Sequence, residues 1–286
     1  MTLAQALAAA AHLGLERLDA QLLLLQVLGR PAGDRAWLLA HDGDTLDEGQ
    51  QQQFTLLCGR RAAGEPLAYI AGRKEFFGVD LMVDRRVLVP RPDTETLVEW
   101  ALEVLAPVTS PRVVDLGTGS GAIALAIKSR RPDAQVMATD RSRDALEVAS
   151  ANAQALGLAV EWRRASWLDG IDERFDLIVS NPPYVAAGDP HLQALSHEPS
   201  SALVAGADGL DDLRTIARQA PARLRPLGWL LLEHGYDQAA AVRELLSNAD
   251  FSQVASRRDL GGIERCSGGK GGSEQIASRA LEARTG

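Results

Sequence analysis

The hydrophobic residues at the start of the chain recur at the spacing of an amphipathic helix. Leu3, Leu7 and Ala10 fall on one helical face, and leucines repeat in the same way between residues 18 and 28. No run of alternating polar and apolar residues precedes residue 73, so this part lacks the pattern that is typical of β-strands. Residues 1–72 are therefore predicted to form a small helical domain.

Residues 73–92 have a different pattern. Two short runs that are rich in aromatic and β-branched side chains flank Gly78, which is typical of a β-hairpin. The segment ends in Pro90-Arg91-Pro92. Each proline fixes its own φ and biases the preceding residue towards extended backbone. We therefore predict a hairpin linker that ends in a stiff connection.

From residue 93 onwards, short apolar runs alternate with amphipathic segments. The predicted strands are 112–116, 135–139, 160–164, 175–180 and 229–233, and the predicted helices are 94–105, 121–128, 143–156, 211–224 and 239–248. Strands that are separated by helices form βαβ units, which assemble into a parallel sheet with right-handed crossovers. Residues 93–260 are therefore predicted to be an α/β domain with a doubly wound, Rossmann-like sheet.

The segment 261–286 is unusually rich in glycine. Six glycines fall between residues 261 and 272, and such a density disfavours both helix and strand. We therefore expect an atypical tail without regular structure.

Composition and charge exclude several classes of function. The 286 residues include 30 Lys and Arg against 38 Asp and Glu, which gives a net charge of −8. Affinity for nucleic-acid phosphates needs clustered basic residues, so stable nucleic-acid binding is not expected. No apolar run approaches the length of a membrane span, and the start of the chain does not resemble a secretory signal. Cys58 and Cys266 form neither a disulfide framework nor a metal-binding pattern. We expect a metal-free, cytoplasmic monomer.

A glycine-rich loop follows the first strand predicted in the α/β region. Asp115-Leu116-Gly117-Thr118-Gly119-Ser120-Gly121 precedes a helix, where glycines let the backbone approach a ligand and the helix start offers free N–H groups. Asp140 ends the next strand, 23 positions after Gly117, where a carboxylate can accept hydrogen bonds from ribose hydroxyls. The pattern predicts a site for an adenosine-containing cofactor, either a nicotinamide dinucleotide or S-adenosylmethionine. Asp115 favours the latter, because its carboxylate can contact an ammonium group but would repel a pyrophosphate.

The most informative motif is Asn181-Pro182-Pro183-Tyr184, which directly follows the strand predicted at 175–180. The prolines end the strand and stiffen the loop, so that its carbonyl groups point in fixed directions. The Asn181 side chain and the backbone carbonyls of Asn181 and Pro182 can accept both hydrogens of a planar NH2 group, and Tyr184 offers an aromatic face. Such acceptors align the nitrogen with an electrophilic methyl carbon and stabilise the positive charge that develops on it. The motif predicts N-methylation of an amide or of an exocyclic amine.

These residues together resemble the class I S-adenosylmethionine-dependent methyltransferases that carry an Asn-Pro-Pro-Tyr motif. More closely, the chain is similar to the peptide chain release factor N5-glutamine methyltransferases of the PrmC/HemK family. The closer likeness rests on stretches outside the cofactor-binding core, namely Pro66-Leu67-Ala68-Tyr69-Ile70-Ala71-Gly72, Glu75-Phe76-Phe77-Gly78, Val87-Leu88-Val89-Pro90-Arg91-Pro92-Asp93-Thr94-Glu95 and the late strand within 226–235.

The resemblance implies an activity and a set of site residues. Such enzymes use S-adenosylmethionine to methylate the glutamine side-chain nitrogen in the Gly-Gly-Gln motif of class 1 release factors, and S-adenosylhomocysteine is the product. The helical domain helps to hold the protein substrate. The positions that match cofactor-binding residues are Gly117, Thr118, Gly119, Ser120, Gly121 and Asp140, together with Trp167 beside the adenine. Asn181 matches the residue that contacts both the substrate amide and the cofactor methyl group. The catalytic candidates are Asn181, Pro182 and Tyr184, and with Pro183 they match the glutamine pocket; Arg91 and Glu95 are secondary candidates.

Two other functions stay open at this point. The first is methylation of a nucleobase amine in DNA or RNA, which the same acceptors would serve if the base were flipped out of a duplex. The net charge and the lack of a recognisable target-recognition domain disfavour it. The second is a cofactor-sensing or partner-binding module without catalysis, which the presence of both Asn181 and Asp140 disfavours.

One stretch departs from the resemblance. The family closes its sheet with an aliphatic strand after an acid–arginine pair, but here Glu264-Arg265 is followed by Cys266-Ser267-Gly268-Gly269-Lys270. We therefore expect the last strand to be missing or replaced and the edge of the sheet to be unpaired. His234, which follows the strand predicted at 229–233, is expected to be structural.

Overall fold

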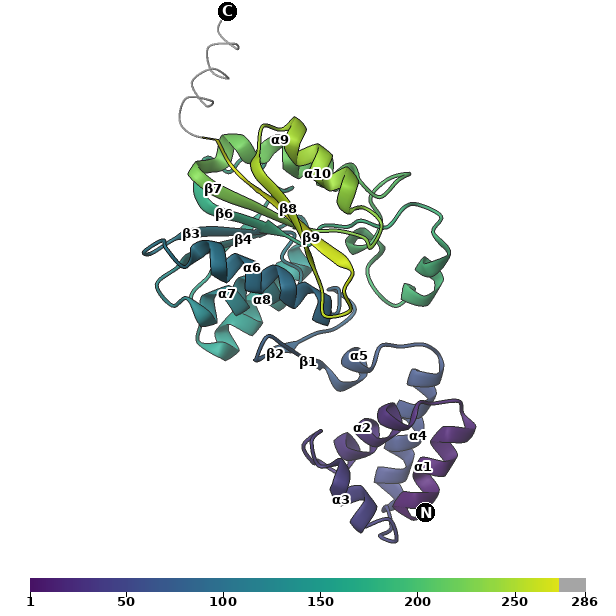
Figure 1. Cartoon of the computed structure of the whole chain (residues 1–286). Coiled ribbons are helices and arrows are strands. Elements are labelled where there is room, and N and C mark those ends of the chain that lie inside the picture. The colour runs from purple at the N-terminus through teal and green to yellow at the C-terminus, as the bar shows by residue number, and fades with distance from the viewer. Residues whose placement is uncertain (273–286) are drawn as a thin grey trace, which may run out of the picture. The chain divides into compact units, whose positions relative to one another are not determined.

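A computed structural model of the protein describes residues 1–272 (Figure 1). The chain divides into two compact units, of which the first ends at Arg73 and the second begins at Lys74. None of the described helices is long and apolar enough to cross a membrane.

The first unit consists of helices. Its elements are α1 (Leu3–His12), α2 (Arg17–Val27), α3 (Arg35–Ala40), α4 (Glu48–Ala62) and α5 (Leu67–Ala71). Thr2 and Asp47 begin α1 and α4 with capping boxes, in which the side chain of each accepts from a backbone N–H three residues later. The apolar faces pack around Leu23, Leu24 and Phe54, which are almost completely buried. The helical prediction for this part of the chain is confirmed.

A β-hairpin follows α5. Strands β1 (Arg73–Phe76) and β2 (Val79–Met82) form a two-stranded sheet. The two residues between them, Phe77 and Gly78, both have positive φ, of 51° and 81°. Positive φ at both central residues is the geometry of a type I′ turn, which matches the twist of a hairpin. The hairpin that the sequence predicted around Gly78 is therefore present.

The second unit contains a seven-stranded sheet with the order β5-β4-β3-β6-β7-β9-β8. Its strands are β3 (Arg112–Leu116), β4 (Gln135–Asp140), β5 (Glu161–Arg164), β6 (Phe175–Ser180), β7 (Leu224–Glu233), β8 (Ser252–Arg258) and β9 (Glu264–Lys270). Strands β3 to β7 are parallel, and β9 is antiparallel to both of its neighbours. The strand order reverses between β3 and β6. In open α/β sheets, ligands bind at such a switch point, outside the carboxyl ends of the strands.

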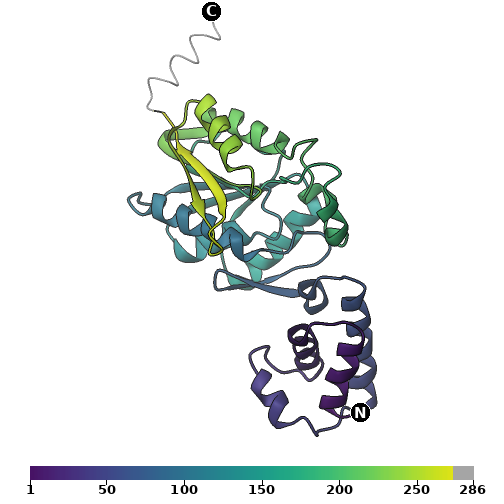
Figure 2. The same cartoon turned by 45° about the vertical axis from the view of Figure 1, so that its right-hand side comes forward.

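Helices cover both faces of this sheet. They are α6 (Glu95–Leu105), α7 (Ala122–Arg130), α8 (Arg143–Leu156), α9 (Asp211–Gln219) and α10 (Ala239–Asn248), with short 3-10 helices η1 (Pro92–Thr94), η2 (Pro190–Leu195), η3 (Ser200–Ala202) and η4 (Ala220–Arg223). Both views place α9 and α10 on one face and the earlier helices on the other (Figure 1, Figure 2). The doubly wound, Rossmann-like fold predicted from the sequence is confirmed.

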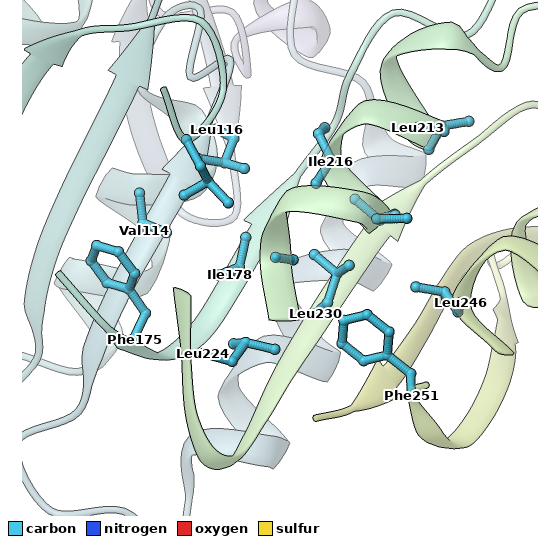
Figure 3. Close-up of a cluster of buried hydrophobic side chains, with 14 of the residues drawn as sticks. Val114, Leu116, Phe175, Ile178, Leu213, Ile216, Leu224, Leu230, Leu246 and Phe251 are labelled. Carbon is cyan, nitrogen blue, oxygen red and sulfur yellow. The ribbon is translucent and has the colours of Figure 1, made fainter. Parts of the chain in front are cut away.

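The core on the α9–α10 face joins helices to central strands. Ile178 and Leu230 of the sheet lie with Ile216 of α9 and Leu246 of α10 in one cluster, and all four are fully buried (Figure 3). Each such side chain contributes about 1.5–3 kcal/mol relative to an exposed one. This packing holds the carboxyl ends of β6 and β7 next to each other.

His234 takes part in a chain of polar side chains that includes Ser267 of β9 and Ser256 of β8. Its Nδ1 bonds to the Gly235 carbonyl oxygen at 2.9 Å, and its Nε2 bonds to Ser267 Oγ at 2.8 Å. Ser267 in turn bonds to Ser256 Oγ, which accepts from Arg243. Burial lowers the pKa of His234, so the ring is neutral at pH 7, and both of its nitrogens bond within the protein. This is the structural role expected for His234.

The expectation for the glycine-rich segment was wrong where the structure describes it. Residues 264–270 form β9, which pairs with β7 on one side and β8 on the other. The physical reason lies in the glycines. A Cβ on Gly268 would lie 2.4 Å from Leu231 Cδ2 and 3.0 Å from Trp100 Cη2, and a Cβ on Gly269 would lie 2.8 Å from Phe251 Cβ. Glycine occupies this strand because its neighbours leave no room for a side chain. The rest of the predicted tail, residues 273–286, lies outside the described residues.

Substitution of Gly268 by alanine tests this explanation. The added methyl group meets both the Leu231 side chain and the Leu230 backbone oxygen, so Gly268→Ala should lower the free energy of unfolding by about 1–3 kcal/mol in denaturant titrations. Lys270→Ala, in the same strand, adds no atoms and should leave stability nearly unchanged. Equal stability of the Gly268→Ala variant and the wild type would contradict the close packing of β9.

Candidate active site

The carboxyl ends of the parallel strands bring the predicted motifs together. The glycine loop follows β3, Asp140 ends β4, and Asn181 directly follows β6. A cavity of about 440 Å³ lies at this edge of the sheet. Of the residues predicted as site residues, those that line it are Gly117, Gly119, Asp140, Trp167, Asn181 and Pro183.

Several further lining residues were not predicted. Apolar or small side chains of the cavity wall include Val87, Leu88, Ala145, Ala165 and Ala202. Val87 and Leu88 lie in a stretch that carried the family resemblance, but no pattern in the sequence indicated that they face a cavity. The others come from a helix, a strand end and a long loop, and only the fold brings them together.

Gly117 is required by both backbone geometry and space. Its φ is +68°, in the left-handed region, and a Cβ there would lie 3.0 Å from the ring of Trp167. A side chain would therefore both strain the backbone and push the ring aside. The loop and the indole can approach this closely only because residue 117 is glycine.

Asp140 ties the glycine loop to β4. Its Oδ2 accepts from the backbone N–H of Gly119 at 3.0 Å, and its Oδ1 accepts from that of Ser142 at 2.8 Å. The carboxylate is only partly buried, and each oxygen has a further lone pair. Asp140 can therefore hold the loop and accept hydrogen bonds from a ligand at the same time.

Trp167 forms a flat wall of the cavity. It has a φ of +53°, which costs a residue with a side chain about 1–2 kcal/mol. Its backbone oxygen accepts from Thr139 Oγ1 at 3.3 Å, which holds this conformation at the end of β4. Strained backbone of this kind gathers at functional sites.

Four of the predicted loop residues do not line the cavity. Asp115, Thr118 and Ser120 are buried, and Gly121 packs against Leu125 and Ala149. Asp115 Oδ2 accepts from Thr118 Oγ1 at 2.6 Å and from the Ala124 backbone N–H at 3.2 Å. These residues shape the loop and begin α7. Asp115 Oδ1 has no hydrogen-bond partner among the described residues, so the contact between Asp115 and a cofactor ammonium stays a prediction.

The Asn181 side chain is held by one contact. Its Nδ2 donates to Thr94 Oγ1 at 3.2 Å. No donor among residues 1–272 bonds to its Oδ1. Pro182 and Pro183 are buried, so they fix the backbone on which Asn181 sits. Asn181 lines the cavity on this rigid loop, and an amide oxygen without a donor is able to accept from a ligand N–H.

Tyr184 is not among the residues that line the cavity. Its hydroxyl donates to Glu233 Oε1 at 3.3 Å, and its backbone oxygen accepts from Gln238 Nε2 at 3.0 Å. Burial and the Glu233 charge raise the pKa of Tyr184, so it stays protonated near neutral pH and cannot serve as a base there.

The secondary candidates Arg91 and Glu95 do not line the cavity either. Arg91 pairs with the buried Glu198, which also accepts from the Val89 backbone N–H at 3.0 Å. Glu95 Oε1 accepts from the Phe77 backbone N–H at 3.0 Å. The Glu198 contacts anchor the loop 185–208, from which Pro199, Ser201 and Ala202 reach the cavity.

Comparisons with known proteins agree with this geometry. The family profile "Methyltransferase small domain" matches residues 94–208, and the profile "PrmC N-terminal domain" matches residues 2–72. A release factor glutamine methyltransferase from Xylella fastidiosa strain Temecula1 is 52% identical over 269 residues, which are 93% of this chain and 97% of the relative. One from Bordetella pertussis is 51% identical over 260 residues, 90% of this chain and 95% of the relative.

The chain belongs to the release factor glutamine methyltransferase family. The family prediction made from the motifs is confirmed. A solved methyltransferase from Pyrococcus furiosus has a TM-score of 0.51 at 18% identity and covers 77% of this chain and 98% of its own. A Thermus thermophilus 16S rRNA methyltransferase, solved with S-adenosylmethionine and guanosine, has a TM-score of 0.52 at 21% identity over 70% of this chain and 49% of its own. Both share the methyltransferase fold.

The role of Gly117 in this family member can be tested through stability. Gly117→Ala should lower the free energy of unfolding by about 1–3 kcal/mol, because the methyl group strains the backbone and meets the Trp167 ring. Gly119→Ala is the matched variant: its φ is also positive, at +55°, but nothing lies within 4 Å of the added Cβ. The Gly119→Ala variant should lose only the free energy that backbone strain costs, about 1 kcal/mol. Equal losses in calorimetry would show that the ring contact is unimportant.

Asp115 should make stability depend on pH. Burial raises its pKa from 3.8 to about 7, so between these values the folded state binds a proton that the unfolded state has lost. The contribution of Asp115 to the free energy of unfolding is fully present below the pKa that it has in the unfolded state. This contribution is lost as the pH rises through the pKa that it has in the folded state. Between pH 6 and 8, Asp115→Asn should therefore gain about 1 kcal/mol relative to the wild type in denaturant unfolding. Asp237→Asn, at an exposed position, should show no such gain, and a constant difference for Asp115→Asn would refute the shift.

Proposed function

We propose that this protein transfers a methyl group from S-adenosylmethionine to the N5 amide nitrogen of the glutamine in the Gly-Gly-Gln motif of class 1 peptide chain release factors. The observation that carries the proposal is the geometry of Asn181. Its amide NH2 donates to Thr94, its carbonyl oxygen has no donor among the described residues, and the residue lines the cavity of a chain that belongs to the release factor glutamine methyltransferase family.

The cavity residues fit the cofactor. Asp140 offers acceptors for the ribose hydroxyls, and the Trp167 ring offers a stacking surface for the adenine. Gly117 and Gly119 let the backbone approach it closely. When bound, S-adenosylmethionine supplies an electrophilic methyl group on a sulfonium sulfur, and S-adenosylhomocysteine is the product.

The residues of the motif then activate a weak nucleophile. The lone pair of an amide nitrogen is delocalised, so the protein must orient it and stabilise the charge that forms. Asn181 Oδ1 and the backbone carbonyls of Asn181 and Pro182 accept its two hydrogens, which aims the nitrogen at the methyl carbon. The same acceptors stabilise the positive charge on the nitrogen. Tyr184 acts from behind as a rigid support for this loop. No strong base is needed, because the methylated nitrogen loses its proton easily to water.

The helical unit and the net charge of the chain bear on which substrate is methylated. We propose that the helical unit, residues 1–72, helps to hold the release factor, and that the enzyme acts as a cytoplasmic monomer. Methylation of a nucleobase amine is the competing function, since the acceptors of Asn181 would serve it too. The net charge of −8 disfavours a substrate that is rich in phosphate.

Replacement of Asn181 tests both the activity and the role. Asn181→Ala removes one acceptor of the substrate NH2 group and should reduce methyl transfer to release factor at least about 100-fold. Cofactor affinity, measured by calorimetry, should change by less than about tenfold, since Asp140 and Trp167 remain. Transfer is measured with isotope-labelled S-adenosylmethionine and purified release factor.

Two controls make the result decisive. Asn248→Ala, an exposed position on α10, should transfer at the wild-type rate. A release factor with the Gly-Gly-Gln glutamine changed to alanine should take up no label. Label that appears on nucleic acid instead of release factor would overturn the proposed substrate, and full activity of Asn181→Ala would remove Asn181 from its role.

A further inference from the structure

Glu233 is a buried carboxyl group directly behind the Asn-Pro-Pro-Tyr loop. It ends β7, and only 1% of its surface is exposed. Ser180 of β6 pairs with Leu232 of β7 in the parallel sheet. Asn181, which follows β6, and Glu233, the last residue of β7, therefore lie side by side at this edge of the sheet.

The carboxyl group is connected to both ends of the motif. Its Oε1 accepts from the Tyr184 hydroxyl at 3.3 Å. The Thr94 hydroxyl lies beside it, and Thr94 Oγ1 accepts from Asn181 Nδ2 at 3.2 Å. Thr94 is itself 4% exposed, so water does not compete for these contacts. One buried acid thus contacts Tyr184 directly and reaches Asn181 through Thr94.

Charged and titratable groups from several elements face this carboxyl. Arg265 of β9 is the opposite charge, and it also pairs with Asp259 at 3.2 Å and Asp93 at 3.3 Å. Cys266 lies opposite Glu233 in the β7–β9 register. The Thr94 hydroxyl favours the ionised carboxylate most, followed by Arg265 and the Tyr184 hydroxyl, whereas burial and Asp93 oppose ionisation. Burial is the largest effect and raises the pKa of Glu233 to about 7.

The two protonation states have different consequences for Asn181. A carboxylate only accepts hydrogen bonds, so the Thr94 hydroxyl donates towards it and keeps its lone pairs for the Asn181 NH2 group. A protonated carboxyl group donates instead, and then Thr94 can donate to Asn181 and favour the reversed amide. Oε2 has no partner among the described residues. A buried acid with an unpaired oxygen costs stability, which calls for a reason other than packing.

We propose that Glu233 is a positioning residue: as a carboxylate it keeps Thr94 and Tyr184 as donors and thereby turns the Asn181 carbonyl oxygen towards the amide nitrogen that is methylated. This rests on the proposed function, because it assumes that Asn181 Oδ1 accepts from the substrate. Glu233 does not line the cavity itself, so its effect is on the orientation of Asn181 and not on cofactor contact.

Glu233→Gln is the first test, because glutamine keeps the size and removes the charge. At saturating substrates and pH 8, its kcat should fall at least about tenfold, while KM for S-adenosylmethionine stays within about threefold. The ratio of wild-type to variant kcat should shrink as the pH is lowered from 8 to 6, because the wild-type carboxylate becomes protonated there. A purely structural role would not make this ratio depend on pH. Glu244→Gln, exposed on α10, is the matched control and should behave as wild type at every pH.

A pair of Thr94 variants tests the inference even if Glu233→Gln does not fold. Thr94→Ser keeps the hydroxyl and should retain kcat within about threefold, whereas Thr94→Val should lose about tenfold or more. A kcat of Glu233→Gln within twofold of wild type, with a ratio that is constant across pH, would overturn the inference while the proposed function stands. So would equal rates for Thr94→Ser and Thr94→Val. Failure of the wild-type enzyme to label release factor would instead refute the proposed function on which the inference rests.

Discussion

The parallel register of β3, β4, β6 and β7 determines where every part of the candidate site lies. Leu116 of β3 pairs with Thr139 of β4 and with Ser180 of β6, and Ser180 pairs with Leu232 of β7. The four strands therefore end at one level, and the residues that follow them meet at one edge. A shift of one residue in any strand would turn its last side chain to the opposite face. The fully buried apolar layer below this edge is what prevents such a shift.

Much of the site could be predicted because strand ends are visible in a sequence. Apolar runs that stop at Gly117, Asp140 and Asn181 placed these residues at the edge of a parallel sheet, and the structure finds them on one cavity. The complete burial of Asp115 and its contact with Thr118 could not be predicted, because a carboxylate before a glycine loop has the same sequence pattern whether it is exposed or buried. The predicted helix 211–224 was too long, since α9 ends at Gln219 and gives way to η4, where Pro221 lacks the N–H that an α-helix interior needs.

The two antiparallel strands were missed for opposite reasons. β8 is a half-exposed edge strand whose sequence is mainly polar, so it lacks the apolar run of a central strand. β9 is a buried strand, but its two glycines give it a sequence that is typical of a loop. Here the requirement for glycine comes from Trp100 and Phe251, which are remote in sequence. Propensity cannot report such long-range contacts, and tertiary packing overrides it.

Two buried acids support the two motifs in a related way. Asp115 accepts from Thr118 in the glycine loop, and Glu233 accepts from Tyr184 in the Asn-Pro-Pro-Tyr loop. Each ends or nearly ends a parallel strand, and each replaces water as the acceptor for a hydroxyl of its loop.

The position of β9 between β7 and β8 has a separate consequence for assembly. Among the described residues, β8 meets the sheet only through β9, which comes later in the chain. The ribosome makes β8 before β9, but β8 can join the sheet only after β9 has been made.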